Sequence, residues 1–277
     1  MAERKTIDEL TLMDDYMFAA VFENTNFLRP LLEFILKIKI AEIKLVEPQR
    51  SEKQGYHSKG IRLDLYVVDE NGTIYNVEVQ TYTEGALPKR MRYYQSVVDI
   101  SILSPGSDYS QLRKSFIIFI CNYDPFERDR YIYTFENTCR EEPDLTFGDD
   151  SFKVVVNTKG SRGEISAELK EILTYLDNES VTGPISRELD EAVNSVKSSE
   201  ERRLEYMRLT LRDNEMIAKG RQEGRQEGRQ EGRQEGRQEE QISSIRNLMD
   251  TLKLTAQQAM DALKISESDQ QRYLSLL

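Results

Sequence analysis

Residues 61–81 read IRLDLYVVDENGTIYNVEVQT, two runs of alternating apolar and polar side chains around a short polar segment. Alternation with a period of two is typical of β-strands, and Asn71-Gly72 is a turn signal, so the stretch predicts a β-hairpin. A three-residue loop from Glu70 to Gly72, with the glycine left-handed, keeps the acidic residues together on one face. A two-residue loop would instead set an acid opposite an apolar residue, so the alternation favours the three-residue loop.

With this loop, Asp64 and Glu78 lie directly opposite each other, with Cβ atoms about 4.5–5.5 Å apart. Two carboxylates this close repel unless a shared proton, a basic neighbour such as Arg62 or a divalent cation compensates their charge. Oxygen ligands of this kind suit Mg²⁺ or Mn²⁺. Gln80, on the same face, can orient a water or contact a phosphate but cannot act as a general base. The pattern is equally compatible with a solvated hairpin face that carries ordinary surface acids.

The flanking sequence predicts further helices and strands around the hairpin. Apolar residues at helical spacing indicate helices, and the uninterrupted apolar run SFIIFICNY at 115–123 is typical of a strand covered on both faces. One or two helices are predicted over 14–22 and 28–38, others from Pro88 onward and at 164–178, and further short strands at 130–137 and 152–158. This order of elements predicts an α/β or α+β domain with a central mixed sheet.

The composition excludes several classes of protein. The chain has 277 residues and a net charge of −11, which argues against a polybasic binder, although bound metal ions can reverse the local sign at an active site. The single histidine, His57, excludes a His-rich zinc site. Cys121 and Cys139 form no disulfide framework, and no apolar run reaches membrane-spanning length. We therefore expect a soluble, cytoplasmic protein with no membrane partner.

The C-terminal part is charged and helical in composition and contains five consecutive Gly-Arg-Gln-Glu copies at 220–239. Each glycine costs a helix about 1 kcal/mol relative to alanine, and like charges recur at i,i+4, so an isolated helix here should be weak. Two interpretations remain: a solvated, fraying helical spacer, or a glycine seam that packs against a second copy. The last segment predicts two short helices, with Thr255–Gln258 and Ser266–Asp269 as capping pairs.

These patterns predict four segments along the chain. They are a mixed α/β domain at 1–180, a charged helical segment at 181–219, the repeat at 220–239 and short C-terminal helices at 240–277. A homo-oligomer formed through the C-terminal helices is a candidate assembly.

Four stretches together resemble a known family: DDYMFAAVF, IRLDLYVVDENGTIYNVEVQ, RMRYYQSVVD and GSDYSQLRKSFIIFI, spread over roughly residues 10–125. Their order and spacing are similar to the Rpn (recombination-promoting nuclease/putative transposase) group of the PD-(D/E)XK nuclease superfamily. The resemblance implies a restriction-endonuclease-like core with a central mixed sheet, to which a helical C-terminal extension is added.

The resemblance also implies a site. Its catalytic residues would be Asp64, Glu78, Gln80 and Asp15, with Gln80 where the superfamily pattern has lysine, and with Asp14 and Glu23 as alternatives to Asp15. Mg²⁺ (or Mn²⁺) would be held by Asp64, Glu78 and the backbone carbonyl of Val79, with Asp15 as a further candidate. It would polarise the scissile phosphate and lower the pKa of an attacking water.

The helix after the hairpin carries basic and aromatic residues in PKRMRYY. Lys89, Arg90 and Arg92 are candidates for contacts with a nucleic-acid backbone, and Gln95 falls where related nucleases have a polar site residue. The same segment also fits a helix with a buried Met91 and Tyr94 face and a solvated basic face.

Three functions compete on this basis. The first is a Mg²⁺-dependent DNA endonuclease linked to recombination, mobile elements or defence. The second is a catalytically weak or inactive nuclease-fold protein that binds DNA or a protein partner through its helical tail, which the neutral Gln80 and the acidic net charge favour. The third, a purely structural oligomerising protein, leaves the two opposed acids unexplained.

Overall fold

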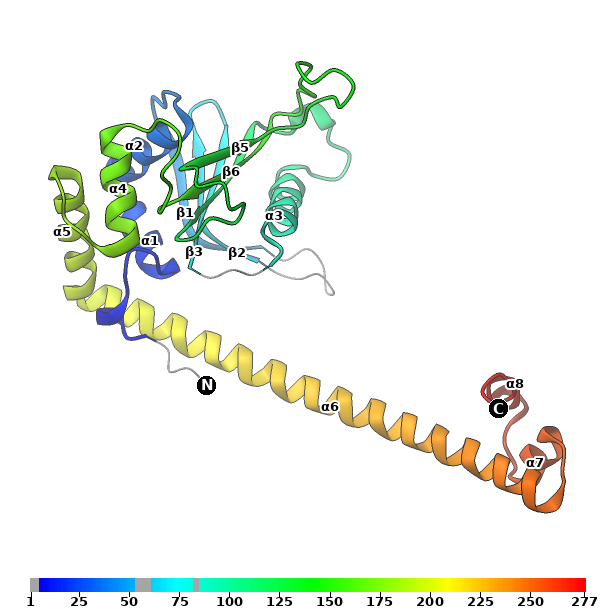
Figure 1. Cartoon of the computed structure of the whole chain (residues 1–277). Coiled ribbons are helices and arrows are strands. Elements are labelled where there is room, and N and C mark those ends of the chain that lie inside the picture. The colour runs from blue at the N-terminus through cyan, green and yellow to red at the C-terminus, as the bar shows by residue number, and fades with distance from the viewer. Residues whose placement is uncertain (1–4, 53–60, 82–84) are drawn as a thin grey trace. The chain divides into compact units, whose positions relative to one another are not determined.

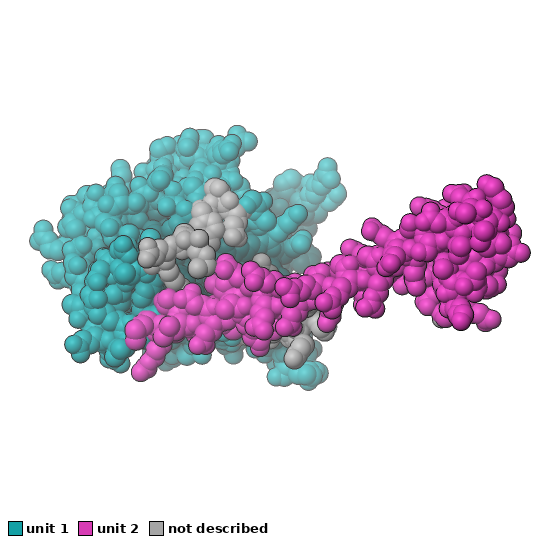
Figure 2. Space-filling model, turned by 90° about the horizontal axis from the view of Figure 1, so that it is seen from below, with its two compact units in different colours: residues 1–206 teal, residues 207–277 magenta. Residues whose placement is uncertain are grey.

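The computed structural model describes residues 5–52, 61–81 and 85–277, and divides the chain into two compact units, 1–206 and 207–277, coloured separately in Figure 2. His57 lies outside the described residues. Within those ranges, no helix is both long enough and apolar enough to cross a membrane.

The first unit is built on one mixed sheet. Its strands among the described residues follow the order β1-β2-β3-β4-β6-β5, and β3, β4 and β6 run parallel while the other neighbours are antiparallel. The strands are β1 (Ile43–Glu52), β2 (Ile61–Asp69), β3 (Ile74–Gln80), β4 (Ser115–Cys121), β5 (Ile132–Phe135) and β6 (Ser151–Asn157). The predicted α/β architecture with a central mixed sheet is confirmed.

The β2–β3 hairpin has the predicted register. Leu65 pairs with Val77, which sets Asp64 opposite Glu78 when the pairing is continued by one residue. The loop is the three-residue one, because the Asp69 N–H donates to the Thr73 carbonyl at 3.1 Å and Gly72 has φ +80°. Glycine adopts this left-handed conformation without the steric cost of a Cβ atom.

Strand β1 was not predicted from the sequence. Its residues IKLVEPQRSE lack period-two alternation and include Pro48, and Gln49 has a left-handed φ of 53°. Proline is tolerated at a sheet edge because its missing N–H faces away from the ladder. β1 is such an edge strand, and it depends on antiparallel pairing with β2.

Helices cover both faces of the sheet (Figure 1). On one face, α1 (Asp15–Phe22) contacts β1, β2 and β3, and α2 (Thr25–Leu36), α4 (Ala167–Asn178) and α5 (Pro184–Ser198) pack around it. On the other face lies α3 (Leu87–Ile102), which contacts β4. Short 3-10 turns occur at Ile7–Glu9 and Tyr109–Gln111. As a result, every residue of β3 and of β4 is buried.

The second unit contains most of α6 (Glu200–Leu252), followed by α7 (Ala256–Ala262) and α8 (Glu267–Leu274). The repeat lies inside α6, and a Cβ atom added at any of its five glycines would meet nothing within 4 Å. A small core forms around Ile245, Ala259, Met260 and Tyr273. The predicted Thr255–Gln258 pair forms a capping box at the start of α7. Ser266 is the N-cap of α8, but its hydroxyl donates to the Asp269 carboxylate and its side chain makes no capping hydrogen bond to the backbone, so the second predicted pair is not formed.

Candidate active site

Asp64 and Glu78 face each other across the β2–β3 hairpin and are held by reciprocal hydrogen bonds. The Asp64 N–H donates to Glu78 Oε1 at 3.0 Å, and the Val79 N–H donates to Asp64 Oδ2 at 3.0 Å. Their exposed fractions are 6% and 1%. The interpretation as ordinary acids on a solvated face is therefore wrong, because the layer that includes α3 removes this face from water.

Burial dominates the electrostatics of this pair. It raises the pKa of Asp64 from 3.8 to about 7, with the negative charge of Asp15 acting in the same direction. The pKa of Glu78 is raised as well, first by burial and then by Asp64. The positive charge of Arg90 opposes both increases, but it does not outweigh the loss of solvation. The pair therefore retains a proton in a range where ordinary surface carboxyls are ionised.

Asp15 is the first residue of α1, and its charge acts on Asp64. Its Oδ2 forms an ion pair with Arg62 Nη2 at 2.6 Å. The two alternatives are engaged elsewhere: Asp14 binds Lys5 at 2.8 Å, and Glu23 binds Arg202 at 2.8 Å. Of the three acids proposed for this position, Asp15 is the one that the fold directs toward the hairpin pair.

Gln80 ends β3 and bridges two groups. Its Nε2 donates to the Val79 carbonyl at 2.6 Å, and its Oε1 accepts from Arg90 Nη1 at 2.5 Å. The carbonyl expected to bind a metal thus accepts a hydrogen bond from the amide of the same strand's next residue. Its second lone pair is available for a metal ion.

The basic residues of α3 separate into two groups. Lys89 and Arg92 are exposed, whereas Arg90 is half-buried and turns inward to Gln80 and to the Tyr94 hydroxyl, which it reaches at 2.9 Å. The predicted helix with buried Met91 and Tyr94 is present. Gln95 is also buried, but its amide donates to Asp99 and Ser115, so its described hydrogen bonds do not reach the acid pair.

A family comparison covers this region: residues 12–142 match a family model described as PD-(D/E)XK nuclease family transposase. This segment is a PD-(D/E)XK nuclease-family domain. It includes all the residues predicted for the site, and the fold and the match agree with the resemblance to the Rpn group. No curated protein and no solved structure matches the chain.

PD-(D/E)XK nucleases generally use divalent metals, and the donor set of this domain fits such an ion. Asp64 and Glu78 offer carboxylate oxygens from facing strands, which suits Mg²⁺ or Mn²⁺, since these ions keep several of their waters. Across 5–52, 61–81 and 85–277, no cluster of three or more His, Cys, Asp or Glu side chains is arranged to hold a metal. Asp15 is paired with Arg62, so the domain offers two opposed carboxylates rather than three.

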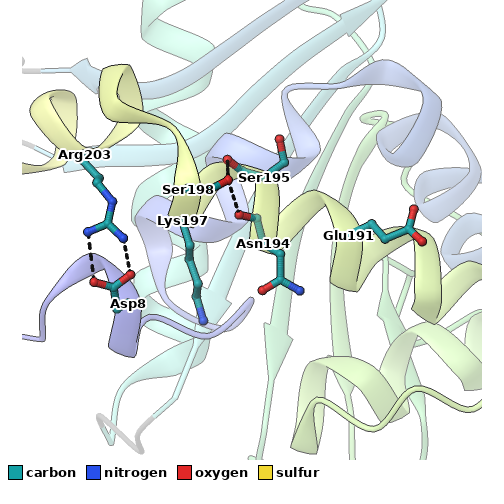
Figure 3. A pocket seen from close by; sticks show the side chains of 7 residues that line it. All are labelled: Asp8, Glu191, Asn194, Ser195, Lys197, Ser198 and Arg203. Carbon is teal, nitrogen blue, oxygen red and sulfur yellow. Dashed lines mark hydrogen bonds and ion pairs between the residues drawn. The ribbon is translucent and has the colours of Figure 1, made fainter.

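A surface pocket elsewhere in the first unit contains none of these residues (Figure 3). It is lined by polar side chains of the Ile7–Glu9 turn, of α5 and of the start of α6, and its Asp8 and Arg203 form an ion pair. It therefore does not belong to the acid site.

Sequence reasoning missed the polar role of two groups between α3 and the sheet. Tyr94 on α3 was expected only as part of a buried face, but its hydroxyl accepts from Arg90 and its pKa is raised by burial and by the charge of Glu78. Asn76 is completely buried, and no hydrogen bond of ordinary geometry satisfies its amide among the described residues, although the amide is near enough to Glu78 to favour the ionised form and oppose the rise of its pKa. The sequence did contain a signal for Asn76: alternation along the strand places it on the same face as Glu78 and Gln80.

Replacing Asn76 by Val should stabilise the protein by about 1–2 kcal/mol, because an unsatisfied buried amide costs about 1–3 kcal/mol and valine suits a buried strand. Chemical denaturation of the metal-free protein measures the change. Thr210→Val on α6 is a parallel test away from the acid site, since it removes another buried polar atom without a partner among the described residues, and it should shift stability in the same direction. If Asn76→Val were instead less stable than the parent, the Asn76 amide would have to form hydrogen bonds that the described structure does not contain.

Proposed function

We propose that the chain is a metal-dependent endonuclease that hydrolyses phosphodiester bonds in DNA. The observation that carries the proposal is the buried, opposed pair of Asp64 and Glu78 inside a PD-(D/E)XK nuclease-family domain. Two facing acids whose pKa values are raised by burial cost folding free energy, and cation binding is a reason to keep them. A link to recombination, mobile elements or defence is part of the same proposal.

Asp64 and Glu78 would hold Mg²⁺ or Mn²⁺ at this site, and the Val79 carbonyl, which also accepts from the Gln80 amide, would be a third oxygen ligand. When bound, the ion polarises the scissile phosphate and lowers the pKa of a coordinated water. The net reaction adds one water: a new P–O bond forms, the bond to the leaving sugar oxygen breaks, and the protons go to that oxygen and to solvent. Asp15 holds Arg62 close to the pair.

The exposed cations of α3 are suited to position the DNA. Lys89 and Arg92 lie in the same helix as Arg90, which reaches the acid site through Gln80. Contacts from Lys and Arg to phosphate oxygens fix orientation and carry little sequence information. We therefore assign DNA-backbone contacts to Lys89 and Arg92 and expect weak sequence preference from them.

Supercoiled-plasmid cleavage tests this function. The purified full-length chain is incubated with Mg²⁺, Mn²⁺ or EDTA, and the nicked and linear forms are quantified over time. We expect nicking with either metal and none with EDTA. A folded protein that fails to nick DNA with either metal, yet binds plasmid in a gel-shift assay, would support the second candidate.

That second candidate is a nuclease-fold protein that binds DNA or a protein partner without efficient cleavage. The observation that favours it is Gln80, because a neutral amide stands in the lysine position. In this case the C-terminal helices provide the binding or self-association surface. Light scattering of the intact chain and of a chain ending at residue 206 would show whether they mediate oligomerisation.

A further inference from the structure

The strand position of Gln80 lacks the positive charge that lysine brings in the PD-(D/E)XK pattern. A cation beside the scissile phosphate stabilises the negative charge that develops during hydrolysis, and such electrostatic stabilisation is often the largest single contribution to catalysis. If this domain cleaves DNA, another residue has to provide that charge.

Arg90 is held against the substituted position. It lies in the first turn of α3, and its Nη1 donates to Gln80 Oε1 at 2.5 Å while its Nη2 donates to the Tyr94 hydroxyl at 2.9 Å. The guanidinium carbon lies 5.2 Å from the ring centroid of Tyr94 and 5.4 Å from that of Phe119. Two hydrogen bonds and two aromatic rings thus restrain a half-buried charge on the same side of the sheet as the acid pair.

The other described cations near the pair are placed differently. Arg62 acts on Asp64 more strongly than Arg90 does, but it is paired with Asp15 at 2.6 Å, and Lys89 and Arg92 are exposed on α3. The charge of Arg90 acts on both Asp64 and Glu78 and favours their ionised forms. The field of this guanidinium therefore already reaches the two carboxylates that would hold a metal.

We propose that Arg90 supplies from α3 the positive charge that lysine supplies in the PD-(D/E)XK motif, binding the scissile phosphate, and that Gln80 is its positioning residue. Guanidinium suits this role because it is permanently charged and its planar fork matches phosphate oxygens. The inference rests on the proposed function, since it names how that site handles its substrate.

The proposal is tested by removing the positive charge at position 90 and placing one at position 80. The full-length proteins to compare are the parent, Arg90→Gln, Gln80→Lys and the double variant Arg90→Gln/Gln80→Lys. The control is Arg187→Gln, which removes an exposed arginine of α5 that has no part in the proposed site. Cleavage of a labelled DNA duplex at saturating Mn²⁺ gives kcat and KM. Titration calorimetry gives the Mn²⁺ Kd without DNA, and circular dichroism establishes that each protein is folded.

For Arg90→Gln, DNA cleavage should weaken while Mn²⁺ binding becomes tighter. We expect kcat to fall about 100-fold, as on removal of a transition-state hydrogen-bond donor, with little change in KM. Mn²⁺ should bind several-fold more tightly, because a positive charge next to the metal acids has been removed. The double variant should regain at least about tenfold of the lost kcat, and Arg187→Gln should keep the parent kcat.

Three outcomes would overturn the inference. If Arg90→Gln cleaves DNA with the parental kcat, the charge of Arg90 has no role in catalysis, but the proposed function is unaffected. A lower kcat with weaker Mn²⁺ binding and no recovery in the double variant means that Arg90 only tethers α3 to the sheet. A parent that neither cleaves DNA nor binds Mn²⁺ refutes the proposed function itself, and the inference with it.

Discussion

Replacing Asp64 by Asn is expected to lower metal-dependent DNA cleavage at least about 100-fold, because losing even an outer partner of a metal ligand typically costs about 10–100-fold. Asn keeps the size of the side chain and can still accept the Val79 N–H bond, so the hairpin should remain folded. The rate of plasmid nicking with Mg²⁺ or Mn²⁺ measures the effect. Glu78→Gln should give a loss of similar size.

The control for this experiment is Asp99→Asn. Asp99 is partly buried on α3, and its pKa is also raised by burial, but it bonds to Gln95 rather than to the hairpin acids. It should retain cleavage close to that of the parent. If a folded Asp64→Asn protein cleaved as fast as Asp99→Asn, the acid pair would not be the active site.

The second large effect concerns stability and pH. The folded-state pKa of Asp64 is raised to about 7, so between about pH 4 and pH 7 the folded chain holds a proton that the unfolded chain releases. The stabilisation is complete below the unfolded pKa and is lost as pH rises through the folded pKa. The metal-free parent should therefore lose on the order of 2–4 kcal/mol of unfolding free energy across this window.

Urea denaturation of the metal-free protein at several pH values between 4 and 8 measures this loss. The double variant Asp64→Asn/Glu78→Gln has no proton to release at the pair, so its stability should be nearly flat with pH and higher than that of the parent at pH 8. Parallel curves for parent and double variant would contradict the raised pKa values. Added Mn²⁺ should stabilise the parent at pH 8 and leave the double variant unchanged.

Local sequence was sufficient for the hairpin and for most helices. Alternation along β2 and β3, together with Gly72, predicted both the loop length and the pairing that places Asp64 opposite Glu78. This succeeded because side-chain parity and turn geometry are local properties. Strand β1 escaped prediction because Pro48 interrupts its pattern and only pairing with β2 makes it a strand.

The candidate site also has features that the sequence predicted and features that it could not predict. Asp64, Glu78 and Gln80 could be placed on one face from the sequence, but their burial could not, since alternation alone is compatible with a solvated face. Arg90 was grouped with Lys89 and Arg92 because the three lie within four residues of the sequence. Its inward turn depends on the packing of α3 over the end of β3, which brings it to Gln80.

The sequence by itself determined the hairpin, its register and the meeting of two carboxylates across it, because a period of two and one left-handed glycine leave a single consistent pairing. Only the tertiary structure decided that this pair is buried, that its pKa values are raised and that Arg90 faces Gln80. These properties come from desolvation and from contacts between elements far apart in the chain, and such contacts exist only once the layers have packed.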